Sequence, residues 1–326
     1  MKGIIFLLNV IFPGILFAES AISFPLEKTI CFSEIGDDSF RKENRFFASE
    51  LIKSKEDFYS PLRDSLPLKV RYKKIDSTEL YLYIYYPPAY VSGEKHPAIV
   101  FFFGGGWIGG SVQQFAGHAK YFASRGMVAM TAEYRVKSRN HTTPFDAVRD
   151  AKSAIRFIRA YADVLGVDPH RIVASGGSAG GHIAAAAGII KGLEESGEDT
   201  TVSSRPDALV LFNPVFDNGP GGYGYDRIGE RYREISPFHN IAPGDPPAIL
   251  FFGTRDQLVP VKTIKAFQKK MQAAGNRCDL FLYEGEKHGF FNYSHPEYYK
   301  KTIHEADKFL TSLGFLSAKN SFSHRP

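Results

Sequence analysis

Short apolar segments alternate with longer amphipathic ones along most of this chain. The apolar segments are hydrophobic on both faces, which is typical of strands that helices cover in a parallel sheet. They lie at residues 97–103, 127–133, 171–177, 208–212, 248–252 and 279–283. Helical spacing of apolar residues follows at 118–124, 146–165, 179–186, 261–274 and 297–313. This alternation predicts an α/β fold with a mostly parallel central sheet and helices on both faces.

The chain before residue 97 has a different pattern. Residues 68–75 and 79–86 flank a short turn and predict an antiparallel hairpin. Residues 21–66 read as an N-terminal extension or cover, with a helical pattern at 40–60. Residues 1–20 combine Lys2, an apolar run and small residues at the end, which predicts a signal peptide and a secreted or periplasmic protein. An uncleaved anchor is the alternative for this segment.

Two further segments interrupt the alternation. Residues 214–247 are too long for an ordinary connection, since they hold a glycine-rich run followed by a charged one. We interpret them as a lid-like insertion at the carboxyl end of the sheet, with a plain surface loop as the alternative. Residues 316–326 form a polar tail.

A glycine-rich turn follows the apolar segment at 171–177. Ser178 is the centre of a Gly-x-Ser-x-Gly pattern that Gly176 and Gly180 complete. A side chain at either glycine would crowd so sharp a turn, and the turn lifts the Ser178 hydroxyl toward the free amides of the next helix. Such patterns are common by chance, but the strand before and the helix after favour Ser178 as a nucleophile.

A serine nucleophile needs a base, and the base needs an acid that orients it. Asp256 and His288 each follow the end of a predicted strand, and they come after Ser178 in the chain order serine, acid, histidine. Asp256 is therefore the candidate acid and His288 the candidate base. Capping of the next helix is the alternative use of Asp256. The weaker candidate bases are His182, His239 and His295, and we expect His182 to be structural.

The same chemistry needs donors for a developing oxyanion. The amide of Ala179 directly follows Ser178, and the bare backbone of Gly105 and Gly106 follows the strand at 97–103. These three residues are the candidate oxyanion hole. Trp107 is a candidate substrate-binding residue that would stack on a sugar ring, and anchoring the core is its alternative role.

Composition excludes several classes of protein. The net charge of +5 is small and scattered, and no run of Lys and Arg carries interleaved aromatic residues, so no nucleic-acid partner is expected. Cys31 and Cys278 have no neighbouring cysteine partners, which argues against zinc or thioredoxin chemistry. They form either one disulfide or two separate thiols. We expect no metal and no cofactor.

These motifs resemble the α/β-hydrolase superfamily. The glycine run at 103–107, the serine motif at 176–181, Asp256 and His288 are more narrowly similar to hormone-sensitive-lipase-like esterases and to exported bacterial acetyl (xylan) esterase and feruloyl esterase relatives. The resemblance implies an α/β-hydrolase catalytic domain at residues 67–315 that hydrolyses carboxylic esters without a metal. Phe103 departs from the pattern, because this branch usually has His there, and the departure puts the loop geometry in question.

The segment Glu133-Tyr134-Arg135 also resembles a family segment that follows the fourth strand. We expect Arg135 to form a buried ion pair with Asp150. The role of this pair would be structural rather than catalytic.

The expected function is a serine carboxylic-ester hydrolase that removes short acyl groups, such as acetyl, from carbohydrate or small esters through an acyl-enzyme. The expected partner is a small-molecule or acylated polysaccharide substrate, without stable membrane association after signal cleavage. The alternatives are a prolyl-type serine peptidase and a catalytically silent binding protein on the same scaffold. Peptidases that resemble this chain usually carry a propeller or a large extra domain, for which this chain has no room. A lipase that acts at membranes needs an exposed apolar lid, and residues 214–247 are too polar and too rich in glycine for that role.

Overall fold

The structure is a computed structural model that describes residues 29–30, 66–88 and 90–318. The predicted signal peptide at 1–20 and the helical pattern at 40–60 lie outside the described residues, as does Cys31. Cys278 is buried and has no disulfide partner among the described residues.

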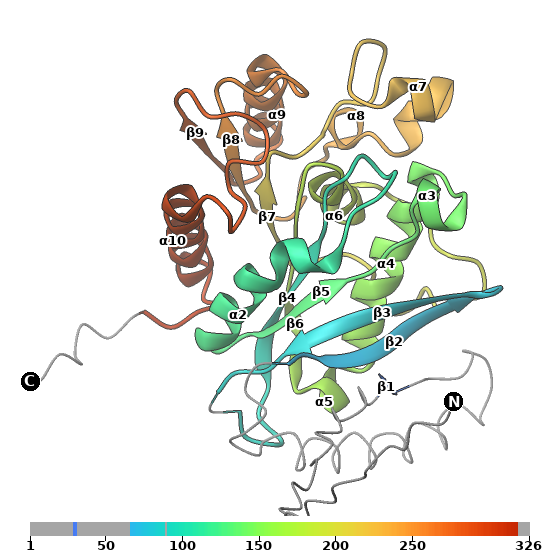
Figure 1. Ribbon diagram of the computed structural model, residues 1–326, viewed down its shortest axis with the longest axis vertical. Helices are drawn as coiled ribbons and strands as arrows, with labels where there is room; N and C mark the ends of the chain where they lie inside the picture. The colour runs from blue at the N-terminus through green and yellow to red at the C-terminus, as the bar shows by residue number, and fades with distance from the viewer. Residues whose placement is uncertain (1–28, 31–65, 89, 319–326) are drawn as a thin grey trace, which may run out of the picture.

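One sheet runs through the described part of the chain (Figure 1). Its strands stand in the order β1-β2-β3-β5-β4-β6-β7-β8-β9. All neighbours from β5 to β9 in this order pair in parallel, whereas β3 is antiparallel to both β2 and β5. The mostly parallel sheet and the N-terminal hairpin are therefore confirmed. The strands are β1 (Thr29–Ile30), β2 (Leu68–Ile75), β3 (Thr78–Tyr85), β4 (His96–Phe102), β5 (Val128–Ala132), β6 (Val167–Gly177), β7 (Ala208–Phe212), β8 (Ala248–Gly253) and β9 (Cys278–Tyr283).

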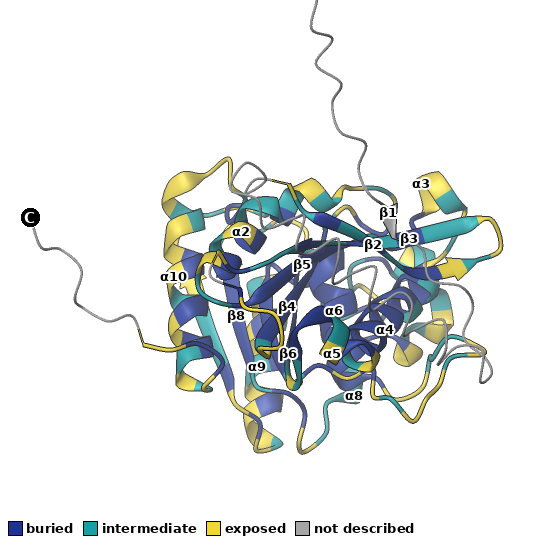
Figure 2. Ribbon diagram, turned by 90° about the horizontal axis from the view of Figure 1, so that it is seen from below, coloured by how far each residue is buried: buried dark blue, intermediate teal, exposed yellow. Residues whose placement is uncertain are grey.

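Helices cover both faces of the sheet (Figures 1 and 2). Alternate residues of β4 point to opposite faces: Val100 and Phe102 lie in one buried cluster, and Ile99 and Phe101 lie in the other. The first cluster includes α4 (Pro144–Ala160), α6 (Ala179–Ile189) and α9 (Val261–Ala273), and the second includes α2 (Ala116–Ser124) and α10 (Pro296–Ser312). The short helices are η1 (Val112–Phe115), α3 (Lys137–Asn140), α5 (Ala162–Leu165), α7 (Tyr225–Ile228), η2 (Gly229–Glu234) and α8 (Pro237–Asn240).

The helix predicted at 146–165 is in fact two helices. Thr143 and Asp146 form a capping box around Pro144, so α4 begins earlier than the apolar spacing indicates. At Tyr161 the backbone leaves helical geometry with ψ at 23°, and the Tyr161 ring packs on Phe157 with centroids 4.6 Å apart. Hydrophobic spacing continues across this break, and the spacing alone therefore did not reveal it.

A buried ion pair ties the sheet to α4. Arg135 donates from Nη2 to Asp150 Oδ1 at 2.8 Å, and Lys73 on β2 donates to the same oxygen at 2.6 Å. All three side chains are at least nine-tenths buried. The predicted pair of Arg135 and Asp150 is confirmed, and its contacts join β2 and the segment after β5 to α4.

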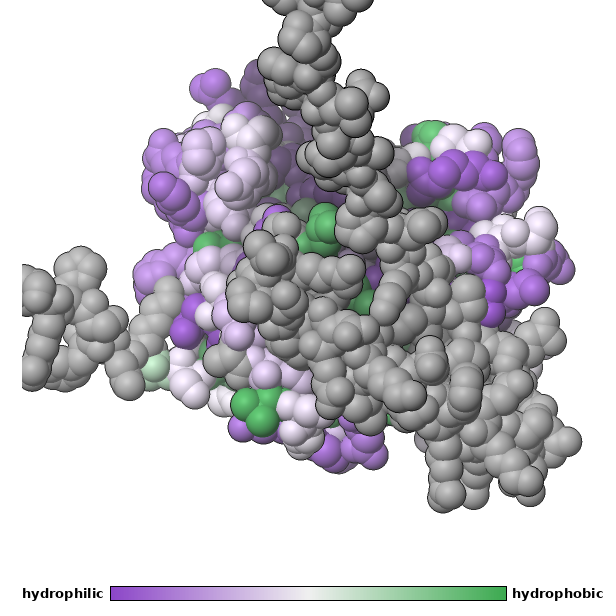
Figure 3. All heavy atoms as spheres, turned by 60° about the horizontal axis from the view of Figure 1, so that its bottom comes forward, coloured by the Kyte–Doolittle hydropathy of each residue, from purple (hydrophilic) through white to green (hydrophobic). Residues whose placement is uncertain are grey.

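Few large hydrophobic side chains are exposed among the described residues. The exposed large hydrophobic side chains lie far apart in the sequence and most of them are on loops, among them Ile108, Leu258 and Tyr293. In the view of Figure 3, hydrophobic residues likewise appear as separate spots among hydrophilic ones. Within the described ranges, no helix is long and apolar enough to cross a membrane.

His118 on α2 is enclosed by aromatic rings. It is fully buried, and neither ring nitrogen has a hydrogen-bond partner within the described residues. Burial lowers the pKa of His118 to about 3, so the ring is neutral at pH 7. Of the described rings that pack on His118, that of Tyr299 is titratable, and burial raises the pKa of Tyr299 to about 12. The rings around it belong to Phe101, Phe115, Phe212, Phe291 and Tyr299.

This burial predicts an acid-sensitive fold. Between pH 6.5, the ordinary pKa, and about pH 3 the unfolded chain binds a proton at His118 and the folded chain does not. The free energy of unfolding therefore falls as pH falls, by up to about 1.4 kcal/mol per pH unit for this group. In His118→Phe we expect a shallower decline, measured by urea unfolding from pH 7 to pH 4. Exposed His304→Phe is the control, and equal slopes in wild type and His118→Phe would contradict the prediction.

Candidate active site

The candidate residues gather at one edge of the sheet. Parallel strands end at the same edge, and each candidate follows the end of such a strand (Figure 1). Gly105 and Gly106 follow β4, Ser178 follows β6, Asp256 follows β8 and His288 follows β9. Residues far apart in the chain thus reach one region.

Ser178 is the single residue between the end of β6 at Gly177 and the start of α6 at Ala179. Its backbone has φ 54° and ψ −119°, a strained conformation for a residue with a side chain. A Cβ on Gly180 would overlap the carbonyl oxygen of Phe102, and one on Gly176 would lie 2.6 Å from the Gly180 carbonyl carbon. Only glycine therefore allows α6 to approach the end of β4 so closely. The amide of Ser178 donates to Phe212 O at 2.9 Å, which ties the turn to β7.

Asp256 and His288 form the contact that sequence order predicts. His288 Nδ1 lies 2.7 Å from Asp256 Oδ2, and the Asp256 side chain is fully buried. Asp256 Oδ1 accepts from the amides of Leu258 at 2.8 Å and Val259 at 3.0 Å. One oxygen of the carboxylate therefore holds the turn before α9 and the other holds the imidazole. Asp256 does not cap α9, because the N-cap of that helix is Pro260 and no side chain caps it.

These contacts set the protonation of the pair. Burial raises the pKa of Asp256, but the hydrogen bond from His288 and the amides of Val259 and Leu258 outweigh it, so this pKa lies below its ordinary value. An ionised carboxylate only accepts, so His288 Nδ1 carries a proton, and in the neutral ring the lone pair is on Nε2. His288 Nε2 is buried and has no hydrogen-bond partner among the described residues, the Ser178 hydroxyl included. It is the atom available to act as a base.

Backbone amides of the glycine loop lie beside Ser178. The Gly104 amide is already engaged, because it donates to Gln114 Oε1 at 2.7 Å. Gly105 O accepts from the amides of Ile108 at 3.0 Å and Gly109 at 3.3 Å. In a trans peptide the N–H points opposite to the C=O, so the Gly106 amide points away from these donors. Across the described chain, no partner is recorded for the amides of Gly105 and Gly106.

Ala179 supplies a further free amide. It is the first residue of α6, so no carbonyl one turn earlier in the helix accepts from it. The positive end of the helix dipole lies at the same place. The geometry at Gly105, Gly106 and Ala179 thus fits the predicted oxyanion donors.

Aromatic packing fixes the glycine loop at Phe103, the position where the esterase branch that this chain resembles usually has His. The Phe103 ring stacks on Tyr134 with centroids 4.2 Å apart and planes 19° apart, and Tyr134 Oη donates to Phe103 O at 2.7 Å. A Cβ on Gly110 would overlap the Phe103 ring, so the ring fills the space inside the loop. The Phe103 side chain therefore holds this loop by packing, while its backbone carbonyl accepts the hydrogen bond from Tyr134.

Trp107 lies in the core rather than on an open platform. Its side chain is 2% exposed, and its ring meets His182 edge-on with centroids 5.0 Å apart. A ring covered in this way offers no free face for a sugar, because α6 and Tyr223 pack around it. This burial fits the alternative role of Trp107 as an anchor in the core. It does not fit the stacking role on a sugar that the sequence led us to expect.

His182 connects α6 to the insertion at 214–247. Its Nε2 lies 2.9 Å from both Asn218 Oδ1 and Ile235 O. Both are acceptors, since Asn218 Nδ2 donates to Tyr223 O, so Nε2 carries the proton. Burial lowers the pKa of His182 to about 4, which keeps the ring neutral. The expected structural role of His182 fits these contacts.

The insertion also contacts the glycine loop. Arg227 on α7 donates from Nη1 to Gly106 O at 3.0 Å, and the Tyr223 ring lies 5.8 Å from the Trp107 ring. A Cβ on Gly106 would lie 2.9 Å from Arg227 Nη1 and 3.0 Å from Tyr223 Oη. The insertion is thus built from short helices that pack over the candidate oxyanion loop, unlike a plain surface loop.

Sequence reasoning missed three side-chain amides at this edge. Asn213, directly after β7, donates from Nδ2 to Asp256 Oδ2 at 3.1 Å and accepts from the Gly289 amide at 3.2 Å. Gln114 and Asn292 bond to each other at 2.9 Å beside the glycine loop. Asn213 was detectable by the rule that found Asp256, namely a polar residue at a strand end, whereas Gln114 and Asn292 carry no such signal.

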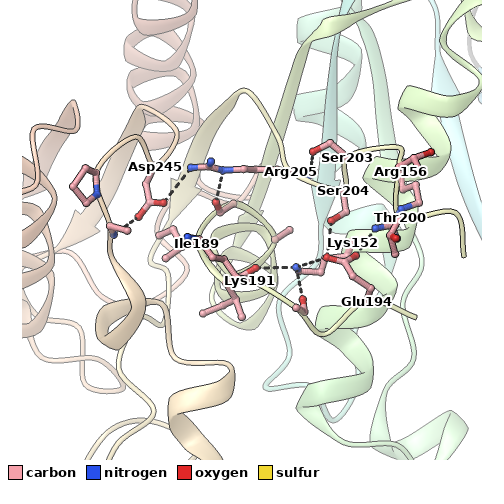
Figure 4. A pocket seen from close by; sticks show the side chains of 17 residues that line it. Lys152, Arg156, Ile189, Lys191, Glu194, Thr200, Ser203, Ser204, Arg205 and Asp245 are labelled. Atoms are coloured by element: carbon pink, nitrogen blue, oxygen red, sulfur yellow. Dashed lines mark hydrogen bonds and ion pairs between the residues drawn. The ribbon is translucent and has the colours of Figure 1, made fainter. Parts of the chain in front are cut away.

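A separate polar pocket of about 410 Å³ lies at the other end of α6 (Figure 4). It is lined by Ile189 and Lys191, whereas Ser178 precedes the first residue of this helix. Four of its charged side chains form ion pairs, because Lys152 donates to Glu194 at 2.9 Å and Arg205 to Asp245 at 3.1 Å. This pocket contains none of the candidate catalytic residues.

The chain is similar to known esterases. A family model named BD-FAE matches residues 82–217, and the dienelactone hydrolase family model matches residues 213–316. The structure of esterase 2 of Thermogutta terrifontis phosphorylated by paraoxon is 48% identical, with a TM-score of 0.75, over 78% of this chain and 97% of that one. The chain belongs to the α/β-hydrolase esterase family. Within this family, esterase 2 has also been solved with propionate and with butyrate bound.

Other members of the α/β-hydrolase esterase family are more distant. Esterase LipC of Mycobacterium tuberculosis is 30% identical over 60% of this chain and 53% of its own length. The acetylxylan esterase of Xylanibacter ruminicola is 27% identical over 60% of this chain and 42% of its own length. The chain thus spans about half the length of the curated relatives it matches.

The close approach of α6 to β4 predicts a position-specific effect of alanine. Gly180→Ala forces a Cβ against backbone atoms, and we expect it to lower the free energy of unfolding by roughly 1–3 kcal/mol. Gly188→Ala in the same helix is the control, because its Cβ would meet only side-chain atoms at 3.3 Å or more. The measurement is urea unfolding of both variants. Equal stability of the two would contradict a backbone constraint at Gly180.

Proposed function

We propose that this protein is a serine carboxylesterase in which Ser178, His288 and Asp256 form a catalytic triad. The observation that carries the proposal is the His288–Asp256 contact of 2.7 Å, which leaves Nε2 as a free base at the sheet edge where Ser178 lies. A fixed tautomer with its lone pair available is what a general base for serine requires. Membership of an esterase family supports the same reaction.

The reaction follows from these positions. The Ser178 hydroxyl oxygen attacks the ester carbonyl carbon while its proton passes to His288 Nε2. The Asp256 carboxylate stabilises the imidazolium, and the amides of Gly105, Gly106 and Ala179 donate to the oxyanion. The imidazolium then gives its proton to the leaving alkoxide oxygen, and an acyl-enzyme remains. Water repeats the same steps, and the acid and free Ser178 are released.

We further propose that the acyl group is short, with acetyl esters of carbohydrates or of small alcohols as the substrate class. Two findings support this choice. Esterase 2, at 48% identity, has been solved with propionate and with butyrate bound, and a more distant relative is an acetylxylan esterase. The predicted signal peptide at 1–20 is consistent with action on an extracellular or periplasmic polymer.

An acyl-chain series tests both parts of the proposal. We expect hydrolysis of p-nitrophenyl acetate, propionate and butyrate, a steep decline toward palmitate, and acetate release from acetylated xylan. Ser178→Ala should lower kcat for the acetate ester by at least roughly 10³-fold. Paraoxon should transfer one phosphoryl group to wild type and none to Ser178→Ala, as measured by intact-protein mass spectrometry.

Histidine variants provide the matched control. His288→Ala should lose activity to a similar degree, whereas His295→Ala alters an exposed histidine before α10 and should keep it. Full activity of Ser178→Ala or of His288→Ala would rule out the triad. Activity that rises with acyl length would rule out the short-acyl part alone.

A further inference from the structure

A chain of side-chain amides joins the candidate oxyanion loop to the loop that carries His288. Gln114 Oε1 accepts from the Gly104 amide at 2.7 Å, and Gln114 Nε2 donates to Asn292 Oδ1 at 2.9 Å. Asn292 Nδ2 then donates to Gly289 O at 2.7 Å. Gly289 directly follows His288, so this bridge spans from the glycine loop after β4 to the candidate base.

The same path continues to the acid. The Gly289 amide donates to Asn213 Oδ1 at 3.2 Å, and Asn213 Nδ2 donates to Asp256 Oδ2 at 3.1 Å. Asp256 Oδ2 is also the oxygen that holds His288 Nδ1. The hydrogen bonds therefore form a continuous path from the glycine loop to the histidine–carboxylate pair.

Each amide in this path has only one satisfied orientation. The Gly104 N–H can only donate and the Gly289 carbonyl can only accept, so both ends of the Gln114–Asn292 bridge are fixed by backbone. A flip of either side chain would place donor against donor or acceptor against acceptor. The Gln114–Asn292 bridge therefore has one favoured geometry, and neither side-chain amide has a flipped orientation of similar energy.

Packing beside the bridge keeps it rigid. Phe115 and Phe291 directly neighbour Gln114 and Asn292 in the sequence, and their rings stack with centroids 5.7 Å apart and planes 14° apart. Both rings are at most 1% exposed. The backbones that carry the two amides are therefore held at a fixed separation by buried side chains.

We propose that Gln114 and Asn292 are positioning residues that set the distance between the oxyanion amides and His288. This inference rests on the proposed function. An ester carbonyl must meet the amides of Gly105 and Gly106 at its oxygen while His288 exchanges a proton with Ser178. A misplacement of about 1 Å between such groups costs up to roughly 100-fold in rate. The bridge acts in the transition state, so it governs kcat rather than KM.

The test uses single and double alanine variants of the full chain with p-nitrophenyl acetate. Gln114→Ala and Asn292→Ala should each lower kcat roughly 10- to 100-fold, with KM changed less than about 3-fold. The double variant should be no slower than the slower single, because either change breaks the same bridge. Gln113→Ala is the matched control, since Gln113 is exposed on the same turn and its side chain forms no hydrogen bond recorded in the described chain.

A swap of the two amides separates positioning from general damage to the fold. Gln114→Asn combined with Asn292→Gln keeps both carboxamides and the total side-chain length. Its kcat should exceed that of either single swap by about 5-fold. The melting temperature of each variant is recorded, because a purely structural role would move that temperature without this compensation.

Each outcome separates the two proposals. A wild type that hydrolyses no ester would overturn the proposed function and this inference with it. A wild type that is active, with Ser178→Ala inactive, leaves the function intact whatever the bridge variants do. In that case, alanine variants with unchanged kcat, a rise confined to KM, additive losses in the double variant, or a swap no faster than the single swaps would each overturn the positioning role.

Discussion

The contact between the backbone of α6 and the end of β4 is the constraint on which the rest of the site depends. Without a side chain at Gly180, the first turn of α6 lies directly against the carbonyl oxygens of Phe102 and Phe103. This contact brings the glycine loop beside Ser178 and aims the amide of Ala179 at the same region. A Cβ there would push the helix away from β4 and separate Ser178, the proposed nucleophile, from the proposed oxyanion donors.

Burial explains which parts were predictable from the sequence. The strands β4, β7 and β8 are buried on both faces, so their apolar runs stood out in the sequence. The candidate acid and base followed from the rule that sites gather at the carboxyl ends of strands. The break at Tyr161 left no sign in the apolar spacing. Gln114 and Asn292 are 178 positions apart, and nothing local in the sequence indicates that they meet.

Trp107 is a second case in which contacts between distant residues could not be predicted from the sequence. A lone tryptophan next to a glycine loop fits either a platform or an anchor, because the sequence does not say what covers it. The covering comes from His182 on α6 and Tyr223 in the insertion, both distant in the chain. Burial by long-range neighbours thus decided a role that residue type alone left open, just as it keeps His182 neutral.

Hydrogen bonds from side chains hold the glycine loop at Gly104 and at Gly106, and they leave the amides of Gly105 and Gly106 unengaged among the described residues. Gln114 engages the Gly104 amide on one side, and Arg227 engages the Gly106 carbonyl on the other. The amides of Gly105 and Gly106 between these anchors have no recorded partner in the described chain. Free donors on a fixed backbone stabilise a developing negative charge without the cost of reorienting at the moment of reaction. One anchor comes from η1 and the other from the insertion, so the insertion contributes to the shape of the site as well as covering it.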